Sequence, residues 1–343
     1  MAQELNITQI LEEYGQYYEK NGQNLTRLKK AFMQPSETLG HATKMVTDDT
    51  IFKLANNIFN PVLQAFQKSF TPKGAVEFIP NPIELRPMKI DYKFFPTDIE
   101  SSWLGFLGGD SSRTIENWPI VKYMLEQYLV EQAIEDKELN EVYKGVWEEP
   151  REGVPGLSGK SMDGLRKQLL DGADHPTYAI NIVEGIGELN EDTIFDQLEM
   201  YDKQISELYT GKRLIHFVAQ KWVRAFKSAK RANGYYFIDS ADKINASIDF
   251  TQHVVVGLPS MNGTKDIFTT MTENMLHLRK RDLDKVHVDL QKHDREIKFL
   301  IHWWEAVGFG CNKLVWTTDA TVNAARGNAA PPVPEEPEST EQP

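Results

Sequence analysis

The sequence predicts an α+β fold, and three observations carry that prediction. Residues 117–145 repeat apolar side chains at helical spacing over an unusually long stretch. Residues 88–94 alternate apolar and polar side chains with the period of a half-exposed strand, and residues 297–309 predict a second, aromatic strand. Hydrophobic residues make up 41% of the 343, including 7 Trp, 12 Tyr and 17 Phe, so the chain can build a large core.

Two helices are expected ahead of the strands. Residues 1–33 repeat apolar side chains at roughly helical spacing. Residues 48–66 do the same, with Asp48 or Asp49 suited to the N-terminal end of the helix. Pro61 falls inside this stretch and should kink or divide the helix.

An extended arm is expected next. After the turn residues 71–74, two segments at 75–79 and 88–94 have the character of strands. Three prolines lie between these segments, at positions 80, 82 and 87. Because proline cannot donate to a sheet ladder, a compact central-sheet hairpin is disfavoured, and a long projecting arm or two-stranded loop is expected.

The remaining elements follow the long helix. Asn117 can cap that helix, Pro119 falls in its first turn and Gly145 ends it. Further helices are predicted at 165–170, 191–209 and 218–231. Further strands are predicted at 178–183, 248–256, 297–309 and 313–317. Residues 319–343 become acidic and proline-rich, which predicts a disordered tail.

Charge and cysteine content narrow the class of protein. The net charge of −12 disfavours a protein that grips nucleic acid or anionic membranes. Cys311 is the single cysteine, so no intrachain disulfide marks the chain as secreted. No apolar run approaches the length of a membrane span and no signal peptide is recognised, so synthesis in a reducing cytoplasm is expected.

One loop resembles a phosphate-binding loop. Residues 153–161 read GVPGLSGKS, and the motif needs Gly, four residues, then Gly-Lys-Ser/Thr. The first glycine should occupy position 154, which is Val154, and a polar stretch rather than a buried strand precedes the loop. A flexible loop is therefore the favoured interpretation, with nucleotide binding as the lesser alternative.

No catalytic, cofactor or metal site is predicted. Gly185 and Gly187 follow a strand, but Asn190 stands where a dinucleotide fingerprint needs its third glycine, so a turn is expected. The eight histidines show no ligand spacing, and His253 is expected to be a satisfied, partly buried side chain. Cys311 is expected to be an inert thiol.

A basic stripe marks the predicted helix at 218–231. Its cations recur at steps of about three residues: Lys221, Arg224, Lys227, Lys230 and Arg231. A solvated helix face is the favoured interpretation. The alternative is contact with phosphate or with an acidic neighbouring subunit.

The order of these elements resembles the major capsid protein fold of tailed double-stranded DNA bacteriophages, which is shared with encapsulins. An N-terminal helical segment, a proline-flanked extended arm, a very long helix, a mixed α/β region and a closing aromatic strand follow one another as in that family. The stretches SFTPKGAVEF and DFTQHVVVGLPS are also similar to capsid proteins of phages infecting Bacteroidetes.

The resemblance implies a division of the chain. The expected parts are an N-terminal helical segment and N-arm (1–70), an extended loop (71–112), a peripheral domain with the spine helix (113–189), an axial domain (190–290), closing strands of the peripheral domain (291–318) and the acidic tail (319–343). The two arms of the extended loop would be residues 75–79 and 88–94.

The same resemblance implies a structural protein of the virion and no enzyme. Copies would assemble into hexamers and pentamers of an icosahedral head around double-stranded DNA, held only weakly. Partners would include a separate scaffolding protein, the portal and other capsid proteins, and no membrane. Alternatives are an encapsulin-like compartment, another virion component such as a portal or tail protein, and an enzyme with a site assembled from scattered residues.

Aromatic side chains on the expected arm are the candidate subunit interface. A thin loop cannot bury such groups by itself, so another copy would cover them. The candidates are Phe94, Phe95, Trp103 and Phe106.

Overall fold

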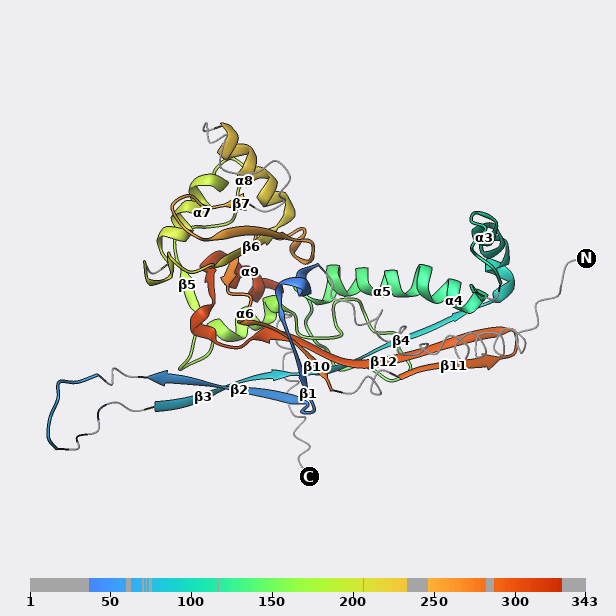
Figure 1. Ribbon diagram of the computed structural model, residues 1–343, viewed down its shortest axis with the longest axis horizontal. Coiled ribbons are helices and arrows are strands. Elements are labelled where there is room, and N and C mark those ends of the chain that lie inside the picture. Colours follow the sequence, from blue (N-terminus) through green and yellow to red (C-terminus); the bar gives the residue numbers. More distant parts are fainter. Residues whose placement is uncertain are drawn as a thin grey trace, which may run out of the picture.

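The computed structural model describes residues 37–328, except 60–62, 70, 72, 74–75, 116, 206, 233–245 and 282–286. The helix predicted at 1–33 lies outside the described residues. Figure 1 shows an elongated molecule in which a long helix lies along a ribbon of strands. A separate layer of helices and strands stands at one end of this helix, and a two-stranded hairpin projects beneath that layer.

The long helix is confirmed, although it is shorter than expected. Its segments follow one another without a break: α4 (Ile120–Met124), the π-helical turn η2 (Leu125–Leu129), α5 (Val130–Asp136) and the π-helical turn η3 (Lys137–Glu141). The 22 residues span about 33 Å. Pro119, rather than Asn117, occupies the N-cap position, and no side chain caps the helix.

A five-stranded sheet lies along this helix (Figure 1). Its central strand β12 (Glu296–Phe309) confirms the strand predicted at 297–309. Three antiparallel strands pair with β12, and one more pairs in parallel with β10: β4 (Arg86–Phe94), β11 (His287–His293), β10 (Met275–Lys280) and β1 (Thr43–Thr47). Burial alternates along residues 296–305 of β12, so one face supports the core there, and residues 305–309 are buried on both faces.

The projecting hairpin corrects two predictions. The described residues between 48 and 66 do not form the expected helix, because β2 (Ile51–Phe59) pairs antiparallel with β3 (Val76–Glu84) along its whole length. The apolar spacing of 51–58 fits a helix and a strand alike, and pairing decides between them. Residues 75–79 and 88–94 are not two arms of one loop, since the second belongs to β4 and pairs with β12. Pro80 and Pro82 lie in β3, which pairs with β2 alone, so its other edge tolerates proline.

A six-stranded sheet forms the second layer, in the order β5-β13-β9-β6-β8-β7. Its strands are β5 (Asn181–Val183), β13 (Trp316–Thr318), β9 (Phe268–Thr270), β6 (Ile215–Ala219), β8 (Val254–Leu258) and β7 (Ala246–Ser247). The helices α7 (Ile194–Lys203) and α8 (Gln220–Ala232) stand beside it (Figure 1). Phe268 stacks on Phe217 at 4.9 Å and meets Phe309 at 5.9 Å, so a shared core joins the two sheets.

The other helices are α3 (Pro96–Gly108), α6 (Leu165–Ala173) and α9 (Asp319–Asn328), and α6 confirms the helix predicted at 165–170. Helix α9 corrects the first part of the expected disordered tail. Val322 and Ala325 pack with Leu170 of α6, and Arg326 forms an ion pair with Asp174. Burial of this apolar face stabilises a helix in a segment whose composition predicted disorder. Residues 329–343 lie outside the described residues.

Candidate assembly surfaces and buried polar networks

The tip of the β2–β3 hairpin carries exposed apolar side chains. Leu63 is 88% exposed and Phe66 is 92% exposed. Polar groups cross the tip: the Gln64 amide donates to the Thr71 carbonyl at 2.7 Å, and Lys73 donates to the Leu63 carbonyl at 2.8 Å. The tip therefore presents large apolar groups that the described chain leaves uncovered.

Two of the four predicted interface aromatics are covered by the chain itself. Phe94 stacks on Phe299 with ring centroids 5.4 Å apart, and it is 6% exposed. Trp103 is equally buried, and its Nε1 donates to the Trp118 carbonyl at 2.8 Å. Another copy is therefore not needed to cover Phe94 or Trp103, contrary to expectation, because β12 and the segment at the start of the long helix cover them.

The other two aromatics keep some exposed surface. Phe95, just before α3, is 41% exposed. Phe106 is half-buried between the rings of Trp118 and Tyr123, and the Arg113 guanidinium lies 4.1 Å from its centroid. Their contact with another subunit stays a prediction.

One of the five cations in the basic stripe on α8, Lys230, does not face solvent. Lys230 is buried and donates to Asp249 at 3.0 Å and to the Ser247 carbonyl at 2.9 Å, so it anchors α8 to the following segment. Lys221, Arg224 and Arg231 are exposed, and Lys227 is half-buried. Lys221 also lies 3.6 Å from Glu191. A partner for the exposed cations stays a prediction.

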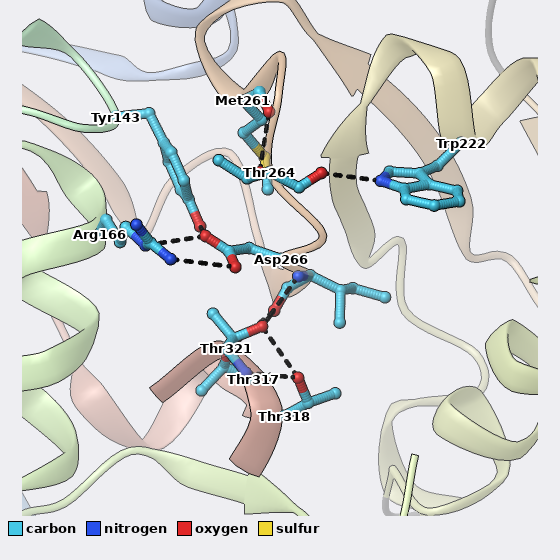
Figure 2. A network of polar contacts seen from close by, with 10 residues as sticks. Tyr143, Arg166, Trp222, Met261, Thr264, Asp266, Thr317, Thr318 and Thr321 are labelled. Atoms are coloured by element: carbon cyan, nitrogen blue, oxygen red, sulfur yellow. Dashed lines mark hydrogen bonds and ion pairs between the residues drawn. The ribbon is translucent and has the colours of Figure 1, made fainter. Parts of the chain in front are cut away.

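A buried network ties the end of the long helix to the six-stranded sheet (Figure 2). The Tyr143 hydroxyl donates to Asp266 at 2.9 Å, and Arg166 Nε of α6 lies 2.9 Å from the same carboxylate. Burial raises the pKa of Asp266 above its ordinary value, although Arg166 opposes the rise. Burial and the Asp266 charge raise the pKa of Tyr143 well above its ordinary value.

Residues 264–267, the turn that contains Asp266, also make hydrogen bonds to other elements (Figure 2). Trp222 Nε1 of α8 donates to the Thr264 carbonyl at 2.9 Å. Thr317 donates to the Ile267 carbonyl at 2.7 Å, and the Ile267 N–H donates to Thr321 at 3.1 Å. Residues 264–267 are therefore fixed by the long helix, α6, α8, β13 and α9 together.

A second network surrounds Glu305 of β12. Lys137 Nζ lies 3.2 Å from its carboxylate, Trp303 Nε1 donates to it at 2.9 Å, and His277 contacts it closely. Burial alone would raise the pKa of Glu305, but Lys137 and His277 outweigh burial and hold the pKa well below its ordinary value. This buried ion pair fixes the long helix to the five-stranded sheet.

Three titratable residues whose proximity sequence patterns did not reveal meet in the second layer, and His253 is a satisfied, buried side chain as expected. Asp202, His216 and His253 are buried, and their ligand-type atoms lie within 4.8 Å of one another. His216 Nε2 lies 3.0 Å from Asp202 Oδ1, and His253 Nδ1 contacts the same oxygen. They come from α7, β6 and the segment before β8, so no local spacing could reveal them.

Each ring nitrogen in this cluster has a protein partner. His216 Nδ1 lies 2.6 Å from the Thr269 hydroxyl. His253 Nε2 lies 3.0 Å from the Tyr209 carbonyl, so both nitrogens of His253 face acceptors, an arrangement that favours the doubly protonated ring. Burial alone would raise the pKa of Asp202, but hydrogen bonds from both histidines lower it to about 2. The residue types could hold a divalent cation, but the set is complete as a buried ion pair.

The loop that resembles a phosphate-binding loop surrounds an internal anion. The N–H groups of Gly159 and Ser161 donate to the two carboxylate oxygens of Glu141, at 2.8 and 3.1 Å. Glu141 is buried at the end of η3. These backbone donors are therefore used by a side chain of the same molecule, which disfavours the nucleotide alternative.

Comparison with known proteins identifies the fold. No family model matches the chain, and no curated protein matches it. A solved chain from the satellite phage P4 procapsid with its size determination (Sid) protein is similar over 87% of this chain and 90% of that one, with a TM-score of 0.52 and 11% identity. Capsid chains of the empty and the native GTA particle are similar over 83% of this chain and 90% of theirs, each with a TM-score of 0.53 and 11% identity.

At this identity the likeness establishes the fold alone. The chain has the tailed-phage major capsid fold, as its element order predicted. No described helix is long and apolar enough to cross a membrane.

Proposed function

We propose that this chain is a major capsid protein, whose copies form the hexamers and pentamers of an icosahedral phage head that encloses double-stranded DNA. The observation that carries the proposal is the β2–β3 hairpin, whose tip exposes Leu63 and Phe66. Nine paired residues per strand would span about 30 Å. A hairpin of that length holds its tip away from the core, where the same chain leaves Leu63 and Phe66 exposed.

Burial of the tip on a neighbouring copy would drive assembly. Fully covering one Leu or Phe side chain contributes roughly 1.5–3 kcal/mol. Every copy in a closed shell would make the same contact, so a modest gain per tip repeats throughout the shell. Exposed Phe95 and the exposed cations of α8, which face solvent in the single chain, are further candidates for contact between copies.

The parts of the shell protein follow from this assignment. The extended loop would be the β2–β3 hairpin, residues 51–84, rather than 71–112. The long helix and β12, which lie within residues 113–189 and 291–318, would form the peripheral domain, joined by β1, β4 and β10 from outside these ranges and by β11, which crosses the boundary at 291. The axial domain, at the centre of each capsomer, would be α7, α8 and the four strands β6 to β9 within residues 190–290, with β5 and β13 completing the sheet from outside this range.

The remaining partners follow from charge and family resemblance. With a net charge of −12, the shell would hold packaged DNA weakly and without sequence preference. A separate scaffolding protein, a portal and other capsid proteins would complete a virion assembled in the host cytoplasm.

The test is assembly of the expressed chain, followed by negative-stain microscopy and light scattering. Wild-type protein should form closed shells, while Leu63→Ser/Phe66→Ser should remain as small species. The matched control is Leu157→Ser/Leu208→Ser, two exposed leucines away from the hairpin that are 72% and 83% exposed. A wild-type chain that stays monomeric at all concentrations would sink the proposal. Shells that contain a cargo protein and no DNA would indicate the encapsulin-like alternative.

A further inference from the structure

A cavity of about 680 Å³ lies where the end of the long helix, the loop at 158–160, α6, the turn at 262–266 and α9 meet. Its size is that of a ligand pocket. Five cationic side chains line it, against the two carboxylates of Glu188 and Asp266: Lys144, Lys160, Arg166, Lys167 and Lys265. The lining therefore has a net formal charge of +3, in a chain whose net charge is −12.

Lys144 is the cation without an anion of its own. It is half-buried, and no carboxylate of the described residues lies within ion-pair distance of its ammonium group. The nearby Asp266 carboxylate is already shared by Arg166 and Tyr143. Burial and the Arg166 charge lower the pKa of Lys144, as expected for a cation that lacks a counterion. An incoming carboxylate would remove this cost.

Two of the other cations, Lys265 and Lys160, can exchange their partners. Lys265 lies 2.6 Å from Glu188, and the two side chains are 55% and 66% exposed. Lys160 lies 3.6 Å from Glu148, also near the surface. Exposed pairs of this kind contribute about 0–1 kcal/mol, so a second anion can compete for these lysines.

We propose that the pocket binds the acidic segment 335–341 of the same chain. Helix α9 supplies one wall of the pocket through Ala320, Ala324 and Ala325, and the sequence continues from α9 directly into this segment. Residues 329–343 contain Glu335, Glu336, Glu338 and Glu341 and no cationic residue.

Chain length permits the contact. Glu335 is seven positions after Asn328, a reach of at most roughly 25 Å. The distance back along α9 from Asn328 to Ala320 is about 12 Å. A tethered segment also has an effective concentration in the millimolar range, which favours it over a free anion. The cavity has room for a few side chains rather than for a DNA duplex.

Zero-length cross-linking of the full-length protein with a carbodiimide tests the proposal. Glu335–Glu341 should link to Lys144, Lys160, Lys167 or Lys265 in preference to Lys89 and Lys203, which are 74% and 73% exposed. Mixing isotope-labelled with unlabelled protein identifies links within one chain. Links between copies, or links spread evenly over exposed lysines, would overturn the proposal.

A binding measurement gives an independent readout. A full-length variant with all four glutamates changed to glutamine should bind a synthetic peptide of residues 329–343 at least about tenfold more tightly than wild type, whose own segment competes. Adding Lys144→Gln to that variant should weaken the peptide, while Lys89→Gln should not. Equal peptide affinity in wild type and the four-glutamine variant, or displacement of the peptide by short DNA duplexes at lower concentration than by free peptide, would contradict the proposal.

Discussion

The Glu141 carboxylate accepts a hydrogen bond from the Gly159 backbone N–H at 2.8 Å, so a buried helix residue holds a loop that is distant from it in sequence. Ser161 donates to the other carboxylate oxygen at 3.1 Å. Glu141→Gln replaces one acceptor oxygen by an amide donor and removes the charge. We expect the free energy of unfolding to fall by about 1–3 kcal/mol, measured by urea denaturation.

Glu135→Gln is the matched control, because Glu135 is an exposed residue of α5 in the same helix. It should change stability by less than about 0.5 kcal/mol. Hydrogen exchange should also accelerate at the Gly159 and Ser161 amides in Glu141→Gln alone. Unchanged exchange at these two amides would show that Glu141 does not order the loop.

Lys137→Met removes one partner of the buried Glu305 carboxylate. The Lys137 and Glu305 side chains are 5% and 2% exposed, so the remaining charge cannot be hydrated. We expect a loss of about 3 kcal/mol in the free energy of unfolding. Lys89→Met removes the exposed Lys89–Asp91 pair and should cost no more than about 1 kcal/mol. Similar losses for the two variants would argue against a central role for the buried pair.

His253 should make stability depend on pH above neutrality. Burial opposes protonation of His253, but the Asp202 carboxylate and the Tyr209 carbonyl outweigh burial and raise its pKa. A raised pKa in the folded state gives stability that is complete below pH ~6.5 and is lost as pH rises through the folded pKa. Urea midpoints measured from pH 6 to pH 9 should therefore fall for wild type.

His253→Gln should be less stable than wild type at pH 6 and should lose less stability toward pH 9. Burial lowers the pKa of His216 and of His277, so the unfolded chain binds their protons more readily and their titration makes stability rise, not fall, as pH increases through ~6.5. Neither can cause the slope in this range. The same slope in His253→Gln would assign the effect to another group.

Gly145 lies where the long helix ends against the segment before α6. A Cβ at this position would lie 2.5 Å from the Glu141 carbonyl oxygen and 2.6 Å from that of Met162, both backbone atoms. Gly145→Ala should therefore destabilise the protein by about 3 kcal/mol, measured by thermal or urea unfolding. Gly105→Ala, inside α3 with open space around the added atom, should stabilise the protein by about 0.5–1 kcal/mol.

Elements with one consistent periodicity could be predicted from sequence. The long helix and β12 have strong patterns, and the structure contains both close to the expected residues. The stretch at 51–59 could not be assigned, because its apolar positions suit either period and pairing with 76–84 decides. Helix α9 was missed because composition says nothing of its packing against Leu170.

Contacts between distant segments were beyond pattern reasoning. Strand β4 pairs with a strand about 200 residues later in the chain, and the Asp202–His216–His253 cluster draws on three separate elements. The order of elements still indicated the fold, because the order of helices and strands can be predicted without knowing how the strands pair. Aromatic content alone did not distinguish Phe94 and Trp103, which the chain covers, from Leu63 and Phe66, which it leaves exposed.

Three charged residues of the π-helical turn η3 contact three different segments of the chain. Lys137 reaches Glu305 in the sheet, Glu138 accepts from the Thr38 N–H at 3.2 Å, and Glu141 reaches the 159–161 loop. An ordinary α-helix turns about 100° per residue, so deleting a single residue here would rotate all later positions by that angle. The length of η3 is consequently constrained more tightly than the identity of its residues. One deletion would break the contacts to several distant segments, whereas a single substitution would disturb only one of them.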